Sequence, residues 1–534
     1  MRDFQQQRRL PALAMNGMAA TQNPHATRTA IEVLQRGGTA IDAAVAAAAV
    51  LAVVEPSQTG IGGDCFVIMA KNGTHELVAY NGSGRAPIGI PRDQFVNGAS
   101  RLDYSSPHSV TIPGAVDAWT RLIEDHGRKD EDHGRKDIAE LLAPAIAFAR
   151  DGFPVHSWAA YEWATFEDRL RHDANATRLF LPRGRPMREG EVFRNPGLAK
   201  ALTLIAKMGR DGFYKGAVAR DAVNYLRGLG GSHTIEDFET TAGEYVEPVR
   251  TTYRGMEVCQ IPPNNQGVTA LLMLNILEGY DLASLGPMSA QRLHLEIEVG
   301  RLAYRDRDAL VCDTHYAAFP MQEILSKDYA ARLRSAIRAD RMMDHLPPAL
   351  MRRSDTAYIT VVDRDRNCVS FINSIYGPFG STRVAPTYGI LLQNRGMGFS
   401  LEPGHPNAIG PRKRPLNTIM PGLAIKDGRP FISLGVVGAD YQPFGHVHVL
   451  TGIADFGLDP QGAIDQPRVF YSGGDTQVER GLPVGTVQEL ERLGHRVVEA
   501  REPLGGGQMI KIDWSEGVLI GGSDPRLDGI ALGY

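Results

Sequence analysis

The chain changes its secondary-structure pattern at Thr356, and this change constrains the fold more than any other feature. Residues 110–350 show mostly helical periodicity, which is clearest at 115–124, 138–151, 217–229 and 289–310. From Thr356 onward, short apolar runs alternate with turns that contain Gly and Pro, as strands do. Helices are expected to return only near residues 460–464 and 484–493. The pattern therefore predicts an α+β fold.

The N-terminal residues predict a helix pair followed by a hairpin. Residues 25–51 have helical spacing that is interrupted at Gly37-Gly38, which indicates two helices. The apolar stretch 41–54 is shorter than the roughly 20 residues that span a bilayer, so we expect a buried core helix. Two short apolar runs, 65–70 and 76–80, flank a turn at Asn72-Gly73 and predict a β-hairpin.

The composition excludes several classes of function. A chain of 534 residues suggests about two to four domains, and its hydrophobic fraction of 43% is ample for a large core. The net charge of −4 gives no electrostatic case for nucleic acid or for an anionic membrane. No apolar segment typical of a signal peptide follows the charged N-terminus, so a cytoplasmic location is expected. The four cysteines lack zinc-site spacing, and we expect no metal or organic cofactor.

One polar segment is duplicated. Residues 124–130 recur without change as residues 131–137. Structural repeats are longer units with an apolar pattern, so we interpret this one as a duplication in an exposed loop. A metal pair made of His126 and His133 is the alternative interpretation.

The tripeptide Asp355-Thr356-Ala357 precedes a predicted strand and suggests a catalytic nucleophile. A threonine hydroxyl needs an adjacent base, and in one class of enzymes that base is the freed α-amine of the same threonine. Such an amine exists here only after the chain breaks between Asp355 and Thr356. Alone, such a tripeptide is more often an ordinary strand start, so its meaning depends on the flanking motifs.

Those motifs resemble the γ-glutamyltranspeptidase family of the N-terminal-nucleophile hydrolase superfamily. The match includes Asp363, seven residues after Thr356, and then further segments in the family's order: Gly60-Ile-Gly-Gly-Asp64, 373–381, Lys413-Arg414-Pro415-Leu416, Gly435-Val-Val-Gly438 and Gly521-Gly-Ser-Asp-Pro-Arg526. The resemblance implies a four-layer αββα sandwich. It also implies self-cleavage into a large fragment, 1–355, and a small catalytic fragment, 356–534, which fold together.

The resemblance assigns the catalytic groups residue by residue. Thr356 is the expected nucleophile, and Ser374 stands where the family has a threonine whose hydroxyl bonds that nucleophile. Gly438 and Ala439 stand at a Gly-Gly pair whose N–H groups form the oxyanion hole. If the second position requires a positive φ, alanine carries strain there.

The expected substrate pocket departs from the family pattern. Asn417 and Thr418 replace a Ser-Ser pair that contacts the substrate α-carboxylate. The family residues that hold the γ-glutamyl amino group are replaced by Gly398, Arg395 and Tyr376, and the carboxylate-binding arginine aligns near Ser83, two residues from Arg85. Loss of an acid and gain of an arginine favour a carboxylate over an ammonium. A solvated surface position is the alternative for Arg395.

The sequence thus predicts a self-processing amidohydrolase that cleaves the amide of a small, carboxylate-bearing molecule through a Thr356 acyl-enzyme. Its expected partners are that substrate and the two fragments of its own chain, with homo-oligomerisation left open. A genuine γ-glutamyltransferase or glutathione hydrolase, an oxamate or glutaryl-amide acylase, and an uncleaved non-catalytic scaffold are the alternatives. The tract Gly505-Gly-Gly507 lacks the strand–helix context of a nucleotide site and is interpreted as a loop near the active site.

Overall fold

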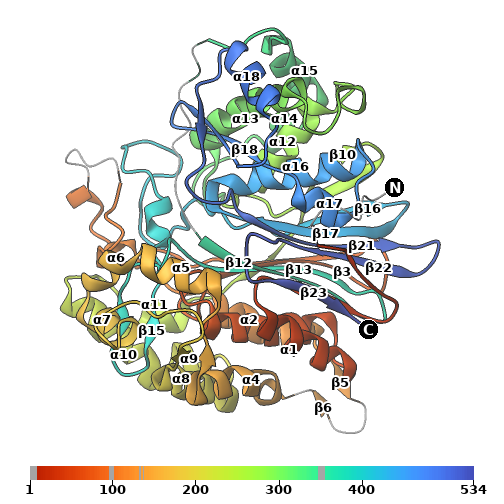
Figure 1. Ribbon diagram of the computed structural model, residues 1–534. Helices are drawn as coiled ribbons and strands as arrows, with labels where there is room; N and C mark the ends of the chain where they lie inside the picture. The colour runs from red at the N-terminus through yellow and green to blue at the C-terminus, as the bar shows by residue number, and fades with distance from the viewer. Residues whose placement is uncertain (1–8, 96–100, 131–133, 136, 345, 347–354) are drawn as a thin grey trace.

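Two seven-stranded antiparallel sheets form the centre of the molecule (Figure 1). The computed structural model describes residues 9–95, 101–130, 134–135, 137–344, 346 and 355–534. In order across the first sheet, the strands are β1 (Ala12–Ala14), β22 (Val518–Ser523), β21 (Gly506–Asp513), β17 (Arg429–Val437), β16 (Gly422–Lys426), β11 (Met256–Gln260) and β10 (Val249–Tyr253). The second sheet runs β23 (Ile530–Gly533), β2 (Met18–Thr21), β12 (Asp355–Val362), β13 (Cys368–Tyr376), β3 (Asp64–Ala70), β4 (Leu77–Gly82) and β9 (Glu244–Val246).

The two sheets pack face to face through apolar side chains. Tyr358 and Ile372 of the second sheet share a buried cluster with Val437 and Ile510 of the first. β13 is buried along its whole length, including its polar residues, because it packs against β17 of the first sheet and against α2 of the helical layer. The resulting interface holds β12 and β17 against each other.

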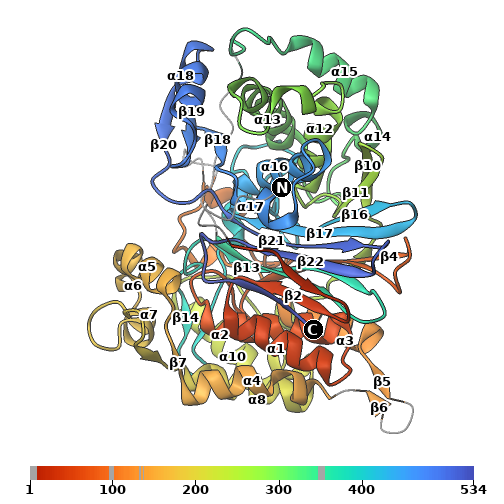
Figure 2. The ribbon, with the colours of Figure 1, turned by 45° about the vertical axis from the view of Figure 1, so that its right-hand side comes forward.

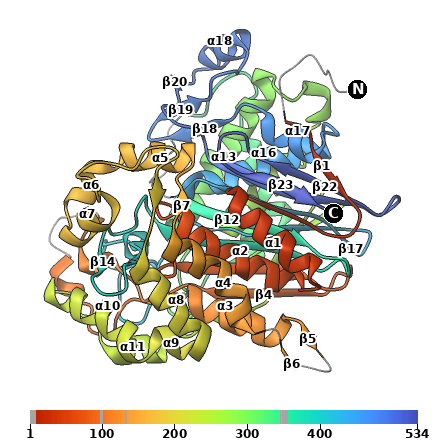
Figure 3. The same cartoon turned by 60° about the horizontal axis from the view of Figure 1, so that its bottom comes forward.

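Helices cover the outer face of each sheet and complete four layers (Figures 2 and 3). Beneath the second sheet lie α1 (Pro24–Gln35), α2 (Ala40–Val54), α3 (Ala115–His126), α4 (Ile138–Asp151) and α8 (Pro196–Met208). Over the first sheet lie α12 (Gly267–Leu277), α13 (Ala290–Leu310) and α16 (Gln442–Ala454). All residues of α2 are buried, as expected for the apolar stretch. The predicted αββα sandwich is confirmed.

Shorter elements extend both helical layers. The lower layer continues through α5 (Ser157–Thr165), α6 (Glu167–Arg171), α7 (Ala174–Phe180), α9 (Asp211–Tyr214), α10 (Gly216–Gly228) and α11 (Ile235–Thr240). The upper layer adds α14 (Met321–Ile324), α15 (Lys327–Ala336), α17 (Pro460–Asp465), α18 (Val484–Arg492) and a small sheet of β18 (Val469–Ser472), β19 (Asp475–Val478) and β20 (Val497–Glu499). Small strand pairs are β5 (Lys129–Asp130) with β6 (Gly134–Arg135), β7 (Phe153–Pro154) with β8 (Val192–Phe193), and β14 (Val384–Ala385) with β15 (Ile390–Leu391).

Residues on both sides of Thr356 build each sheet. β12 pairs with β2 from the start of the chain on one side and with β13 on the other, while β13 in turn pairs with β3. Two fragments produced by a break at Thr356 would therefore remain joined by strand pairing and by a common core. Among the described residues, no helix is both long and apolar enough to cross a membrane.

Most predicted elements are present, but one prediction is wrong. The predicted helix pair, hairpin and four long helices correspond to α1, α2, β3–β4, α3, α4, α10 and α13. Helices do not return only near 460–464 and 484–493, because α16 also follows Thr356. This helix is buried on all sides, so it lacks the polar stripe by which a helix is recognised in a sequence.

Within the duplicated segment, residues 124–126 end α3 and β5 pairs with β6, while residues 131–133 and 136 lie outside the described part. His133 of the alternative metal pair is one of those residues. The described residues contain no group of three or more His, Cys, Asp or Glu side chains placed to hold a metal ion. The four cysteines are buried and unpaired with one another.

Candidate active site

Thr356 lies at the start of β12, beside an irregularity in the pairing with β13. Asp355 pairs with Tyr376 and Ala357 with Asn373, so the register shifts across Thr356. Such a bulge re-aims the side chain at its centre, and bulges are frequent beside active sites. Thr356 is fully buried in the uncut chain. A single polar side chain is thus directed into the interior at the end of a central strand.

Two polar side chains meet the Thr356 hydroxyl. Thr356 Oγ1 lies 3.3 Å from Ser374 Oγ and donates to it. Gln442 Nε2 donates to Thr356 Oγ1 from 3.4 Å. The Gln442 side chain is fixed in this orientation because its Oε1 accepts the Met420 N–H at 2.8 Å. The structure thus places Ser374 beside Thr356, the expected nucleophile, and adds Gln442, which the sequence analysis missed.

Gly438 and Ala439 follow β17 in a tight turn next to this site. Both have positive φ, +116° at Gly438 and +53° at Ala439. A Cβ on Gly438 would lie 2.9 Å from Gly505 Cα, so only glycine fits there. The sequence analysis expected strain at Ala439 if this position required a positive φ. The structure shows that it does, because Ala439 holds a left-handed conformation that costs an L-residue about 1–2 kcal/mol.

Arg395 is the centre of a second buried cluster. Its side chain is fully buried, so the alternative of a solvated surface arginine is wrong. Arg395 Nη1 donates to Thr418 Oγ1 at 3.0 Å, and the guanidinium carbon lies 4.4 Å from the centre of the Tyr376 ring. Tyr376 itself has a φ of +77°, which is unusual for an aromatic residue and indicates that its surroundings impose the conformation.

An acid that the sequence analysis missed faces this arginine. Asp64 Oδ2 lies 3.6 Å from Arg395 Nε and accepts from Asn417 Nδ2 at 3.2 Å. Its Oδ1 accepts from Gln393 Nε2 and from the Gly84 N–H, each at 2.8 Å. Burial raises the pKa of the Asp64 carboxyl, against the opposing effects of Arg395 and Gln393. The sequence analysis predicted a pocket with an added arginine and no acid, but Asp64 supplies an acid beside Arg395.

Two further sequence-predicted positions lie outside this cluster. Arg85 contacts Asp313 at 3.3 Å and Glu244 at 3.8 Å. Burial lowers the pKa of the Arg85 guanidinium, as does the nearby Arg414. Gly398 ends the short helix that begins at Arg395, and its carbonyl accepts from Asn407.

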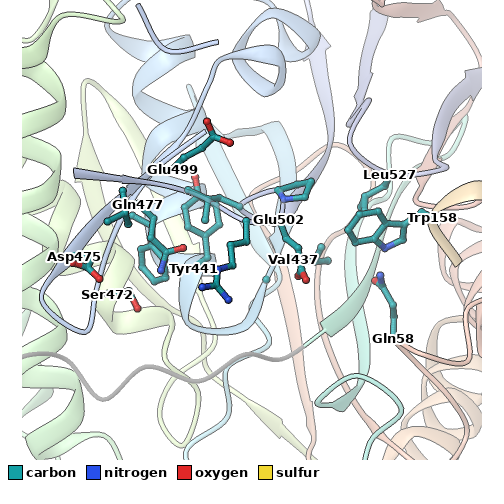
Figure 4. A pocket seen from close by; sticks show the side chains of 17 residues that line it. Gln58, Trp158, Val437, Tyr441, Ser472, Asp475, Gln477, Glu499, Glu502 and Leu527 are labelled. Atoms are coloured by element: carbon teal, nitrogen blue, oxygen red, sulfur yellow. The ribbon is translucent and has the colours of Figure 1, made fainter. Parts of the chain in front are cut away.

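A cavity of about 600 Å³ opens beside the Gly438 turn (Figure 4). Val437, Gly438 and Gly505 form part of its wall, while Trp158, Tyr441 and Leu527 supply large apolar surfaces. Carboxylates of Asp475, Glu499 and Glu502 line the side formed by the β18–β20 sheet and the loop after it. The Gly505-Gly-Gly507 tract is thus close to the site as expected, although its last two residues already belong to β21.

Comparisons with known proteins place this arrangement in context. The family model described as Gamma-glutamyltranspeptidase matches residues 26–534. The chain is 39% identical over 525 residues to the glutathione hydrolase-like YwrD proenzyme of Bacillus subtilis, covering 96% of this chain and 97% of the relative. It is 31% identical over 534 residues to the oxamate amidohydrolase proenzyme of Klebsiella pneumoniae, covering 98% and 99%. The crystal structure of cephalosporin acylase from Bacillus halodurans matches with a TM-score of 0.92 at 37% identity, over 100% of this chain and 99% of that one.

Proposed function

The chain belongs to the γ-glutamyltranspeptidase family of amide-cleaving enzymes, and from this premise we propose that it cuts itself at Asp355–Thr356 and then uses Thr356 to hydrolyse the amide of a small, carboxylate-bearing acyl group. The observation that carries the proposal is the placement of the Thr356 hydroxyl between Ser374 and Gln442, at a bulge in a central strand. Self-cleavage frees an α-amine with an ordinary pKa near 8 to act as base.

The proposed reaction has two steps. Thr356 Oγ attacks the amide carbon while its proton passes to the α-amine, and the carbonyl oxygen becomes an oxyanion stabilised by the N–H groups of Gly438 and Ala439. The C–N bond then breaks, and the departing amine takes that proton. A water molecule next attacks the Thr356 ester, which releases the carboxylic acid and restores the hydroxyl. Both steps use the Thr356 hydroxyl, its α-amine and the N–H groups of Gly438 and Ala439.

The acyl group is assigned to the cluster around Arg395. A guanidinium can form two charge-assisted hydrogen bonds with a carboxylate, and Thr418 and Asn417 add a hydroxyl and an amide beside it. The Tyr376 ring closes one side of the guanidinium. A carboxylate of the substrate would compete with Asp64 for Arg395, so binding depends on a shift of this ion pair.

The amine side of the substrate is assigned to the cavity beside Gly438. When the carbonyl oxygen occupies the oxyanion site, one end of the amide must lie toward this cavity because Gly438 forms part of its wall. Its volume of about 600 Å³ suits a leaving group much larger than ammonia. The apolar surfaces of Trp158 and Tyr441 favour an amine that carries a ring or an alkyl part.

Asp64 supports a second candidate, a genuine γ-glutamyl hydrolase or transferase. An acid and an arginine 3.6 Å apart are the charge pair that an α-amino acid end group requires. Against this candidate, Asp64 already accepts from Gly84, Gln393 and Asn417, so little of its acceptor capacity remains for an ammonium.

The two candidates are separated by paired substrates that differ only in the α-amino group. We expect glutaryl-p-nitroanilide to be hydrolysed with a higher kcat/KM than γ-glutamyl-p-nitroanilide, and Arg395→Gln to reduce that preference. Arg85→Gln serves as the control because Arg85 pairs with Asp313 outside the cluster. A higher kcat/KM for the γ-glutamyl compound, unchanged in Arg395→Gln, would replace the first candidate by the second. Both candidate functions require that Thr356→Ala hydrolyses neither substrate.

A further inference from the structure

The turn that carries the oxyanion N–H groups has its carbonyl oxygens occupied. The Gly438 carbonyl accepts the Tyr441 N–H at 2.9 Å. The Ala439 carbonyl accepts Gln266 Nε2 at 2.9 Å, in addition to the N–H of Gln442. In contrast, the hydrogen bonds of the described residues include none donated by the N–H of Gly438 or of Ala439. The turn is therefore fixed by its acceptors, while its two donors are left for a ligand.

Helices from the part of the chain before Thr356 supply the outer contacts of this turn. Tyr304, on α13, donates its hydroxyl to the Asp440 carbonyl. Arg307, on the same helix, donates from Nη1 to Asp440 Oδ1 at 2.6 Å and to Gln266 Oε1 at 2.9 Å. The Arg307 guanidinium also covers the Tyr304 ring at 4.3 Å.

Gln266 is the link between these helices and the turn itself. It occupies the N-cap position of α12, where its side chain makes no capping hydrogen bond, and it is fully buried. Its Oε1 accepts from Arg307, which fixes the orientation of the amide so that Nε2 faces the turn. Nε2 then donates to both the Ala439 and the Thr418 carbonyls, at 2.9 and 2.7 Å. One side chain thus joins the oxyanion turn to the residue that contacts Arg395.

Ala439 needs such a restraint because of its backbone conformation. At a φ of +53° an alanine is strained, whereas a glycine is not. Strain of this kind is relieved by rotating the flanking peptide planes, and a rotation of the plane between Gly438 and Ala439 would turn the Ala439 N–H away from the reacting oxygen. Strained residues persist where the surrounding structure over-determines them.

We propose that Gln266, supported by Arg307 and Tyr304, is a positioning residue that holds Ala439 in its left-handed conformation and so keeps the oxyanion site formed. The inference rests on the proposed function and goes beyond it in one respect. The large fragment contributes more than a scaffold, because its helices α12 and α13 determine the geometry of the turn that stabilises the reaction. The chemistry at Thr356 is unchanged by this assignment.

The test is a double-mutant cycle with Ala439→Gly, which relieves the strain that Gln266 is inferred to restrain. Gln266→Met removes the amide, and Gln266→Glu keeps an acceptor for Arg307 while losing the donor, so at least one variant retains the Arg307 contact. We expect each to lower kcat about 10–100-fold with KM changed less than about 2-fold, since a lost oxyanion donor costs about 10²–10³-fold. Adding Ala439→Gly to a Gln266 variant should restore kcat at least about 5-fold relative to that variant, with Ala439→Gly alone measured as the fourth corner of the cycle.

Matched measurements separate positioning from mere support of the fold. Gln461→Met removes another buried glutamine, one that bonds Ser523 and has no recorded contact with the turn among the described residues. It should lower the melting temperature without the fall in kcat and without rescue by Ala439→Gly. If a Gln266 variant cuts itself too slowly to give mature enzyme, the rate of fragment formation replaces kcat as the measured quantity, and Ala439→Gly should raise it.

The outcomes distinguish this inference from the proposed function. Wild-type kcat in both Gln266 variants, or losses that Ala439→Gly does not reduce, would overturn the positioning role of Gln266 while Thr356→Ala remains inactive. An active Thr356→Ala enzyme would instead overturn the proposed function itself.

Discussion

Replacing Arg395 by glutamine should destabilise the protein strongly, because the guanidinium is the cation that faces the buried Asp64 carboxylate. Both side chains are fully buried, and Arg395 Nε lies 3.6 Å from Asp64 Oδ2. At that distance, the Coulomb attraction is about 4–5 kcal/mol for an effective dielectric constant of about 20. Breaking a buried pair by removing one partner commonly costs about 3–5 kcal/mol. The hydrogen bonds that Asn417, Gln393 and Gly84 donate to Asp64 remain, so we expect the free energy of unfolding to fall by about 3 kcal/mol.

The loss should depend on pH, with a sign fixed by Asp64. Arg395 lowers the Asp64 pKa against the effect of burial, so its removal raises that pKa further above the value in the unfolded chain. The penalty in Arg395→Gln is therefore full only above the raised folded-state pKa of Asp64. It shrinks as the pH falls through the raised folded-state pKa, because the carboxyl then becomes neutral in place.

The assay is thermal unfolding of single and double variants in a Thr356→Ala background, so that all are compared as one covalent chain. Asp64→Asn combined with Arg395→Gln removes both charges and should recover about half or more of the lost stability. Arg28→Gln breaks an exposed pair with Glu32 and should change stability by less than about 1 kcal/mol. The reasoning fails if Arg395→Gln and Arg28→Gln have the same melting temperature. It also fails if the double variant loses as much stability as the sum of the losses in Asp64→Asn and Arg395→Gln.

Two further predictions concern the nucleophile and acid stability. Ser374→Ala should raise the activation free energy of fragment formation and of turnover by about 2–4 kcal/mol. Ser370 lies on the same strand but bonds Tyr358, so Ser370→Ala should leave the turnover rate within about 3-fold of wild type. Equal kinetics in the two variants would make Ser374 an ordinary strand residue. Burial lowers the pKa of His446 to about 3, of His495 to about 3 and of His233 to about 4. Above the unfolded pKa of about 6.5 these histidines are neutral in both states and cost nothing. Below it only the unfolded chain takes up the proton, so each should remove up to about 1.4 kcal/mol of stability per pH unit as the pH falls from about 6 to 4. Calorimetry across this range measures the slope, and a flat profile would contradict it.

The sequence predicts those parts of the site that follow from local order along a strand. Thr356 and Ser374 lie on neighbouring strands joined by a short turn, so a strand pattern and a family offset are enough to place them together. Asp64 reaches the same region because β3, more than 300 residues earlier, pairs with β13 and sets Asp64 opposite Ser374. Gln442 reaches it from α16, across the packing of the two sheets. A helix without a polar face, α16, hides Gln442 from periodicity arguments. The polar residue at the N-terminus of an apolar run was the one available signal.

Arg395 shows why a charge argument made from aligned positions was incomplete. The sequence showed a new arginine and a lost acid, but the compensating Asp64 lies at the start of β3, more than 300 residues earlier. Arg85, close to an expected clamp position in the sequence, pairs with Asp313 and Glu244 instead. Which buried charges face each other is decided by side-chain direction and sheet register, and a one-dimensional alignment contains neither.

The central claim is that the chain makes its own catalyst at Thr356, and one measurement tests it most directly. Intact mass and N-terminal sequencing of the purified protein should show two fragments that co-purify, with the smaller one beginning Thr356-Ala357-Tyr358. Thr356→Ala should remain a single chain of 58.2 kDa, less the mass of one hydroxymethylene group. A small fragment that begins at any other residue, or a wild-type protein that stays uncut and still hydrolyses the amide substrate, would contradict the account.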